Sequence, residues 1–157
     1  MPEVVVGTPS RAKHELVITR TLDAPRALVF KMWTAPEYLA RWLGPKDYVA
    51  HSIKMDFRVG GGYRACIRSS KGEEYWMTGT YREIVAPERI AFSFHWEEQG
   101  ERGQENTVTV AFTEEGTRTR MTFRQAYFDS VEQCDSHFEG WSEFMDRLVA
   151  QFNRKAA

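Results

Sequence analysis

The residue of this sequence best suited to proton transfer is a histidine in its first half. His51 falls in a run of alternating apolar residues, and strict alternation places it on the same strand face as Val49 and Ile53. A buried neutral imidazole near pH 7 can move a proton on a bound substrate. A cyclase would need a second polar group in the same cavity, and the candidates are Tyr63, Tyr75 or Tyr81. The simpler interpretation of His51 is a hydrogen-bonded core or rim histidine, and catalysis is the alternative.

The other residues with chemistry of their own form no recognisable site. The four histidines (14, 51, 95 and 137) are scattered, and nothing joins Cys134 and His137, which lie three residues apart. The sequence therefore predicts no metal site and no cofactor. His95 falls on the face opposite the aromatic residues of its strand and is expected at the solvent surface or an edge. The glycines 60–62 precede no helix signal, so they predict a chain reversal and not a phosphate loop.

A larger group of aromatic and methionine side chains is expected between a sheet and the last helix. Most of these residues suit an ordinary hydrophobic core. A cavity lined by aromatic and methionine side chains would also suit a planar or lipid-like apolar ligand. The candidate ligand-binding residues are Trp42, Met55, Phe57, Met77, Phe94, Trp96, Phe112, Phe123, Phe138, Trp141 and Met145.

Composition indicates one globular domain. The chain has 157 residues, of which 42% are hydrophobic and 27% charged, and its formal net charge is −1. This charge gives no general attraction to nucleic acid, and no apolar run is long enough to predict a membrane span. Two cysteines make no disulfide framework, so a cytoplasmic protein is expected. We expect a flexible leader at residues 1–13 and a single domain at 14–157.

The elements that must position these residues can be read from hydrophobic periodicity. A period of two predicts a strand at 14–22 and six more strands from residue 48 to residue 126, joined mostly by short turns. Two short helices are expected after the first strand, where Pro25, Pro36 and Gly44-Pro45 supply start and stop signals. Successive strands with short connections favour an antiparallel, twisted sheet.

The last expected element is a helix at residues 136–153. Phe138, Trp141, Met145 and Leu148 recur at spacings of three and four, which places them on one helix face. Ser136 is expected as its N-cap, with a glutamate three residues later as a capping box. A curved antiparallel sheet packed on this helix would give an α+β two-layer domain.

Several short motifs in this order are similar to one family. They are Ile18-Thr19-Arg20 with Ala24-Pro25, Trp33 with Thr34-Ala35-Pro36-Glu37, Arg41-Trp42-Leu43-Gly44-Pro45, Asp56-Phe57-Arg58-Val59-Gly60-Gly61, Gly79-Thr80-Tyr81, Pro87-Glu88-Arg89-Ile90 and Gly140-Trp141. The chain resembles the START-like helix-grip (SRPBCC) superfamily, in the branch named after the activator of the heat-shock-protein-90 ATPase. The resemblance implies about seven antiparallel strands curved around the C-terminal helix, with a cavity for apolar ligands between them.

The functional expectation is non-catalytic binding of a small hydrophobic or aromatic molecule in that cavity. One alternative is a cyclase, dehydratase or hydrolase-like enzyme that uses His51 and a cavity tyrosine. The other is a co-chaperone-like interaction module, which the resemblance raises, although the protein for which the branch is named has an additional domain. A homodimer through exposed strand edges is a further expectation.

Overall fold

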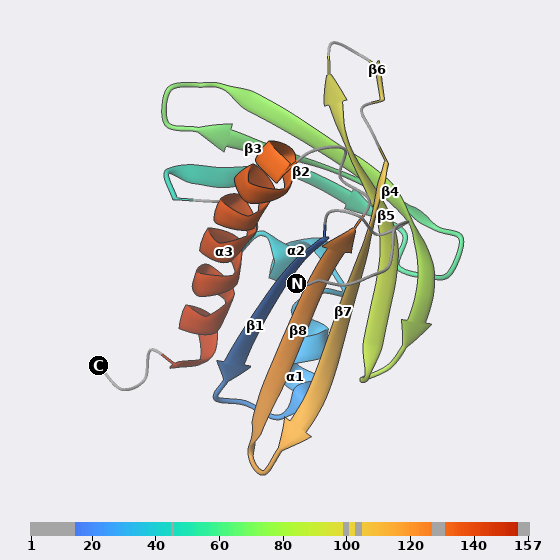
Figure 1. Ribbon diagram of the computed structural model, residues 1–157, viewed down its shortest axis with the longest axis vertical. Coiled ribbons are helices and arrows are strands. Elements are labelled where there is room, and N and C mark those ends of the chain that lie inside the picture. The colour runs from blue at the N-terminus through green and yellow to red at the C-terminus, as the bar shows by residue number, and fades with distance from the viewer. Residues whose placement is uncertain (1–14, 45, 99–100, 103–104, 127–130, 154–157) are drawn as a thin grey trace.

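The structure, a computed structural model, describes residues 15–44, 46–98, 101–102, 105–126 and 131–153. One curled antiparallel sheet holds a long C-terminal helix on its concave side (Figure 1). In chain order the elements are β1 (Glu15–Leu22), α1 (Arg26–Lys31), α2 (Pro36–Leu39), β2 (Tyr48–Met55), β3 (Gly62–Ser69), β4 (Glu74–Val85), β5 (Arg89–Glu98), β6 (Glu101–Arg102), β7 (Asn106–Glu115), β8 (Arg118–Ala126) and α3 (Val131–Asn153). The predicted helix-grip architecture is confirmed, with the two-residue β6 as an addition. The expected leader at 1–13 lies outside the described residues.

The strands are ordered β1-β8-β7-β5-β4-β3-β2, and each neighbouring pair is antiparallel. β6 lies off this path and pairs with β5. The first strand therefore returns to pair with the last one, and β1 and β2 form the two edges. Right-handed twist accumulated over seven strands curls the sheet, which creates the concave face that the helices cover.

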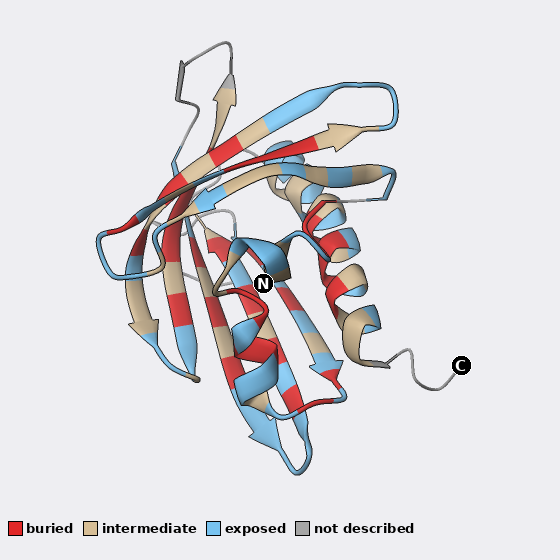
Figure 2. Cartoon of the chain, turned by 180° about the vertical axis from the view of Figure 1, so that it is seen from behind, coloured by how far each residue is buried: buried red, intermediate tan, exposed pale blue. Residues whose placement is uncertain are grey.

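Alternation along the strands explains where the core lies. In β8, Thr119, Met121, Phe123 and Gln125 are buried, while Arg120 and Arg124 between them are exposed and Thr122 is partly covered. The same alternation recurs in the other strands, as the buried and exposed bands in Figure 2 show. The buried side chains of the core cluster point to the concave face, so the core occupies the space between the sheet and the helices.

The short helices occupy the concave side next to α3 (Figures 1 and 2). The indole nitrogen Nε1 of Trp42, just after α2, donates a hydrogen bond to the carbonyl of Met32, just after α1, at 3.1 Å. The rings of Trp33 and Trp42 lie 4.6 Å apart between centroids. These contacts join α1 and α2 into one cover over part of the sheet.

The last helix starts earlier than its sequence pattern predicts. α3 begins at Val131, so Ser136 lies inside the helix and the predicted N-cap and capping box are wrong. The predicted apolar stripe is correct from Trp141 onward: Met145 and Leu148 are fully buried. Phe138 is 44% exposed, although Cys134 and His137 just before it already contact the core and the sheet.

Strand β2 departs from strict alternation at one residue. The register moves from Ala50 opposite Ile67 to Ser52 opposite Cys66, which leaves His51 as the extra residue of a β-bulge. A bulge shifts the phase of the side chains by one position. Val49 and His51 are therefore exposed, whereas Ile53 and Met55 pack on the core. The prediction that His51 faces inward is wrong for this reason.

Candidate functional site

The candidate site is a small cavity between the concave face of the sheet and α3. Its volume is about 50 Å³. Its walls come from α2 and its flanking residues, from β2, β3, β4 and β5, and from one residue of α3. The lining residues are Trp33, Leu39, Trp42, Leu43, Ile53, Met55, Tyr63, Ala65, Met77, Tyr81, Ile90, Phe92, Phe94 and Trp141. None of them carries a charge, so the cavity is a carbon-walled space with a few polar atoms.

The structure brings together five of the eleven candidate ligand-binding residues and separates the other six. Those that line the cavity are Trp42, Met55, Met77, Phe94 and Trp141. Phe112, Phe123 and Met145 are buried in the core away from it, Phe57 and Trp96 are partly buried, and Phe138 is exposed. Periodicity predicts which face of a strand or helix points inward, but it does not predict which of the inward-facing residues reach the cavity.

Most lining residues outside the predicted set have a simple signal. Ile90 and Phe92 alternate with Phe94 on β5, and Ala65 alternates with Tyr63 on β3. A search for small as well as large side chains on the inward face would have found them. Trp33, Leu39 and Leu43 come from the helical cover, whose position over the sheet depends on tertiary packing and has no local pattern.

Two tyrosines supply polar atoms at the cavity wall. The Tyr63 hydroxyl donates a hydrogen bond to the carbonyl of Ser93 at 2.8 Å. Gly79 makes room for it, because a Cβ there would lie 1.9 Å from the Ser93 oxygen and 2.7 Å from the Tyr63 ring. The Tyr81 hydroxyl makes no hydrogen bond with any described residue. Burial raises the pKa of both phenols above the ordinary value of 10.0, so both stay protonated at neutral pH.

A third polar atom among the lining residues is the Trp33 indole nitrogen. Trp33 is buried, and its Nε1 has no hydrogen-bond partner within the described part of the chain. Buried polar atoms are nearly always paired, so an unpaired donor at a cavity wall indicates a place for an absent acceptor. Trp33 and Tyr81 both line the cavity, so their N–H and O–H groups are the candidate donors to its contents.

The histidines take no part in the cavity. His51 is exposed on the bulge of β2, so the predicted convergence of His51 with the cavity tyrosines is wrong. Tyr75 is 46% exposed and does not line the cavity. His95, expected at the solvent surface, is buried because β5 is an interior strand with neighbours on both sides.

The cavity is narrow where the last helix meets the sheet. The rings of Phe94 and Trp141 meet edge to face with centroids 5.7 Å apart, which is ordinary contact for an aromatic pair. Trp141 also contacts Phe123 and Phe144, at 4.5 and 4.6 Å. The helix therefore packs closely on the sheet at this level, and only the small space described above remains.

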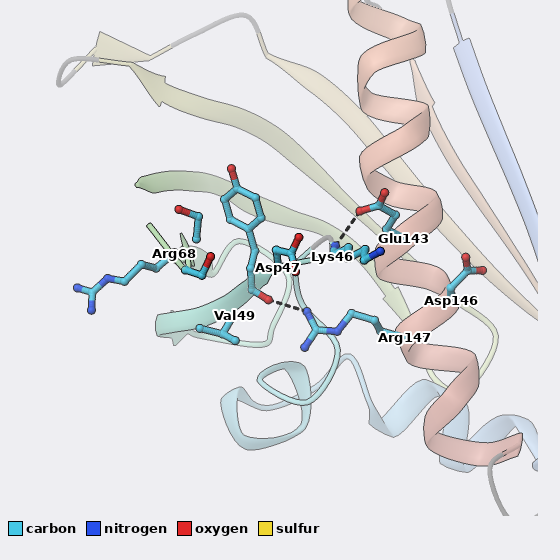
Figure 3. A pocket seen from close by; sticks show the side chains of 10 residues that line it. Lys46, Asp47, Val49, Arg68, Glu143, Asp146 and Arg147 are labelled. Carbon is cyan, nitrogen blue, oxygen red and sulfur yellow. Dashed lines mark hydrogen bonds between the residues drawn. The ribbon is translucent and has the colours of Figure 1, made fainter. Parts of the chain in front are cut away.

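A second hollow, of about 640 Å³, lies between α3 and the start of β2 (Figure 3). Its polar groups already hold the structure together. Arg147 Nη1 donates to the carbonyls of Gly44 and Tyr48, both at 2.9 Å, and Glu143 accepts from the Lys46 amide at 2.7 Å. Three basic and three acidic side chains line this hollow, so it favours neither charge sign. We interpret it as the outer side of a joint between α3 and the segment that leads into β2.

Comparison with known proteins identifies the family. The family model described as "Activator of Hsp90 ATPase homolog 1-like protein" matches residues 23–153. The chain belongs to this family. A search of curated proteins gave no match.

Solved structures of similar proteins share the family's helix-grip fold. The crystal structure of the AHSA1 protein from Silicibacter pomeroyi gives a TM-score of 0.81 at 21% identity, covering 87% of this chain and 96% of that chain. A solution structure from Arthrobacter aurescens gives 0.80 at 24% identity, covering 91% and 88%. A structure from Rhizobium leguminosarum gives 0.72 at 28% identity, covering 86% and 91%.

The match to the homolog 1-like family includes every residue that lines the cavity, from Trp33 to Trp141. All of β1 lies before the matched region. Among the described helices of this family member, none is long and apolar enough to cross a membrane. The family assignment establishes the fold, while the chemistry has to be argued from the cavity itself.

Proposed function

We propose that this protein binds a small, neutral, largely aromatic molecule that carries a hydrogen-bond acceptor, in the cavity between the sheet and α3. The observation that carries the proposal is the pairing of carbon walls with two unpartnered donors, Trp33 Nε1–H and Tyr81 Oη–H. Apolar walls favour an aromatic body through the hydrophobic effect. Two donors without partners favour a carbonyl or ether oxygen on it.

The charge of the ligand follows from the cavity wall. No lining residue is acidic or basic, and moving an unpaired charge into such a site is very unfavourable. Both tyrosines have raised pKa values through burial and stay neutral donors. The cavity therefore favours a neutral ligand over a carboxylate or an amine.

The cavity must expand to hold such a ligand. Its volume is about 50 Å³, whereas ligand pockets usually measure about 300–1,000 Å³. Met55 and Met77 line it, and methionine side chains change shape easily because they are unbranched. The cover formed by α2 and its flanking residues supplies the remaining freedom. We infer that the ligand pushes this cover and the two methionines outward.

The alternative functions have weaker support. An enzyme needs a base near the reacting atoms, but the cavity tyrosines stay protonated and His51 lies outside the cavity. An interaction module needs a gathered apolar surface. The large exposed apolar side chains are spread over β1, α1, β2, the β2–β3 turn, both ends of β4, and α3.

The test compares two ligands that differ in one acceptor, acetophenone and ethylbenzene. At about 100 times its Kd a ligand stabilises the fold by about 2.7 kcal/mol, which raises Tm by about 5–10 °C for a chain of this size. We expect both compounds to raise Tm, and acetophenone to bind more tightly. Calorimetry with each compound gives the Kd values.

A cavity-filling variant makes the test specific. Ala65→Leu adds three carbon atoms at the cavity wall and should abolish stabilisation by acetophenone while the protein stays folded. Ala40→Leu adds the same atoms at an exposed position and should leave binding unchanged. If neither compound raises Tm at millimolar concentration, or if Ala65→Leu binds as well as the natural chain, the proposal is wrong.

A further inference from the structure

Three side chains with metal-binding atoms meet on the face of the sheet that points away from α3. His51 comes from β2, Cys66 from β3 and Glu74 from β4, and their ligand atoms all lie within 4.8 Å of one another. Among the residues that the structure describes, this is the one group of histidine, cysteine and carboxylate side chains that lies so close together. The three residues are far apart in sequence, so the sequence predicts no metal site.

The β-bulge is what completes this group. Cys66 lies opposite Ser52 on β2, and the bulge leaves His51 as the extra residue beside that pair. With strict alternation the imidazole would point into the core. Bulges often redirect a side chain next to a functional site. Here the redirected histidine joins a thiol whose own residue is 0% exposed.

We propose that His51, Cys66 and Glu74 bind a divalent zinc-type cation, with water in the fourth position. Zn²⁺ accepts imidazole nitrogen, thiolate sulfur and carboxylate oxygen in tetrahedral geometry. A set of three protein ligands with one open position is typical of zinc sites that keep a bound water. The thiolate favours zinc over magnesium or calcium, which prefer oxygen ligands.

The geometry needs only a small adjustment. Zinc ligands lie about 2.0–2.3 Å from the metal, so tetrahedral neighbours are about 3.3–3.7 Å apart. The three side chains lie within 4.8 Å of one another, and two of them, His51 and Glu74, are exposed and able to change rotamer. Cys66 is covered by its neighbours on this face (0% exposed) and would fix the position of the metal.

The neighbouring arginine does not block the carboxylate. Arg68 Nε lies 3.0 Å from Glu74 Oε2, and its Nη2 contacts the same oxygen. Neither Arg68 bond uses the other oxygen, Oε1, although the Trp76 side chain also hydrogen-bonds this carboxylate, so zinc would share Glu74 with these partners. Arg68 would then act as an outer partner that orients the carboxylate, as is usual around metal ligands. An exposed ion pair of this kind contributes little energy, so its rearrangement would cost little as well.

The thiol gives the site a defined pH dependence. Zinc binds cysteine as the thiolate, so the metal must displace the proton from the Cys66 sulfur. Metal binding by a protonated ligand releases a proton and strengthens as pH rises. Zinc affinity should therefore increase from about pH 6 to about pH 8.

The experiment uses the full chain without a histidine tag. Calorimetry with Zn²⁺ should give one ion per chain, and Mg²⁺ should give no binding. Titration with Co²⁺ should produce the charge-transfer absorption of a thiolate–cobalt bond. Cys66→Ser should remove this band, and His51→Ala, at an exposed position, should weaken zinc binding by roughly 10–100-fold or more. Cys134→Ser, which alters the other cysteine, should leave the band and the affinity unchanged.

Several results would overturn the proposal. One is a lack of Zn²⁺ binding at micromolar concentration. Another is Co²⁺ binding without the thiolate band. A third is zinc affinity that stays the same in His51→Ala. Because none of these measurements involves the apolar cavity, their failure leaves the proposed ligand binding unaffected.

Discussion

Tyr63 and Tyr81 are neighbours in the cavity wall, with ring centroids 5.5 Å apart, but their hydroxyl groups have different surroundings. The Tyr63 hydroxyl is paired with the Ser93 carbonyl, whereas that of Tyr81 has no partner among the described residues. Two residues of one type on adjacent strands can therefore have separate roles, one structural and one available to a ligand.

This difference predicts opposite effects of the same substitution. Tyr63→Phe should lower the free energy of unfolding by about 0.5–1.5 kcal/mol, because it removes a hydrogen bond and leaves the Ser93 carbonyl unpaired. Tyr81→Phe should leave stability unchanged or raise it slightly, and should reduce the preference for acetophenone over ethylbenzene. Urea unfolding and calorimetry measure the two effects. Equal destabilisation by both variants would contradict this assignment.

His137 predicts a pH dependence of stability. Its Nε2 accepts a hydrogen bond from Trp96 Nε1 at 2.8 Å, and its Nδ1 lies 2.9 Å from the Gln133 carbonyl. This pattern requires the neutral ring. Burial lowers the pKa of His137 below 6.5, and the bond to Gln133 opposes that shift in part.

The unfolded chain then binds a proton at a higher pH than the folded chain does. The stabilising contribution of neutral His137 is complete above about pH 6.5, and it is lost as pH falls from there toward the folded-state pKa. Stability should decline over this range, and His137→Gln, which keeps an acceptor but does not titrate, should flatten the decline. Thermal unfolding at a series of pH values tests this. An identical decline in the variant would disprove the role of His137.

At the scale of elements, the segment between α2 and β2 is attached to the last helix by Arg147. One guanidinium nitrogen donates to two carbonyls, that of Tyr48 (Figure 3) and that of Gly44. The residues just before this joint, Trp42 and Leu43, line the cavity. The attachment of the cover to α3 should therefore control how easily the cavity opens.

Arg147→Met tests this control. It keeps an unbranched apolar stem but removes both hydrogen bonds, which should destabilise the fold by about 1–3 kcal/mol. The association rate of acetophenone, measured by stopped-flow tryptophan fluorescence, should increase. Arg82→Met removes an exposed arginine that pairs with Glu105 at 3.2 Å and is the matched control. An unchanged association rate in Arg147→Met would exclude the segment as the entrance.

Gly79 is the element-scale position with the least tolerance for substitution. A Cβ there would lie 1.9 Å from the Ser93 carbonyl oxygen, which is backbone and cannot move aside cheaply. Gly79→Ala should therefore destabilise the protein by several kcal/mol, near the upper end of point-mutant effects. Gly140→Ala, where nothing lies within 4 Å of the added atom, should be neutral or stabilising within α3. Urea unfolding of both variants gives the comparison.

The sequence allowed the order of elements and the fold to be predicted, because both depend on local periodicity and turn residues. The face of the sheet to which His51 points could not be predicted. The β-bulge that redirects it depends on pairing with the neighbouring strand and cannot be recognised from the alternation in β2 alone. The start of α3 was missed for a similar reason: Ser136 resembles a cap but lies inside the helix. The sequence also did not show which inward-facing residues line the cavity, because Phe112 and Phe123 face inward and are buried but do not line it.

At the scale of the whole molecule, the two proposed sites occupy opposite faces of one sheet. The apolar cavity lies on the concave side, and the group of His51, Cys66 and Glu74 lies on the other side. A chain with a formal net charge of −1 has no general field to attract its partners. Recognition must then come from these local groups.

Strand β3 belongs to both sites, because Ala65 lines the cavity and Cys66, the next residue, faces the other way. Any movement of β3 that accompanies the widening of the cavity would change the spacing of the three metal-binding atoms behind it. The two binding equilibria are then thermodynamically linked, and linkage is reciprocal. If acetophenone changes the Kd for Zn²⁺ by some factor, Zn²⁺ must change the Kd for acetophenone by the same factor. Occupation of either site would then be measurable as a change in the Kd of the other ligand.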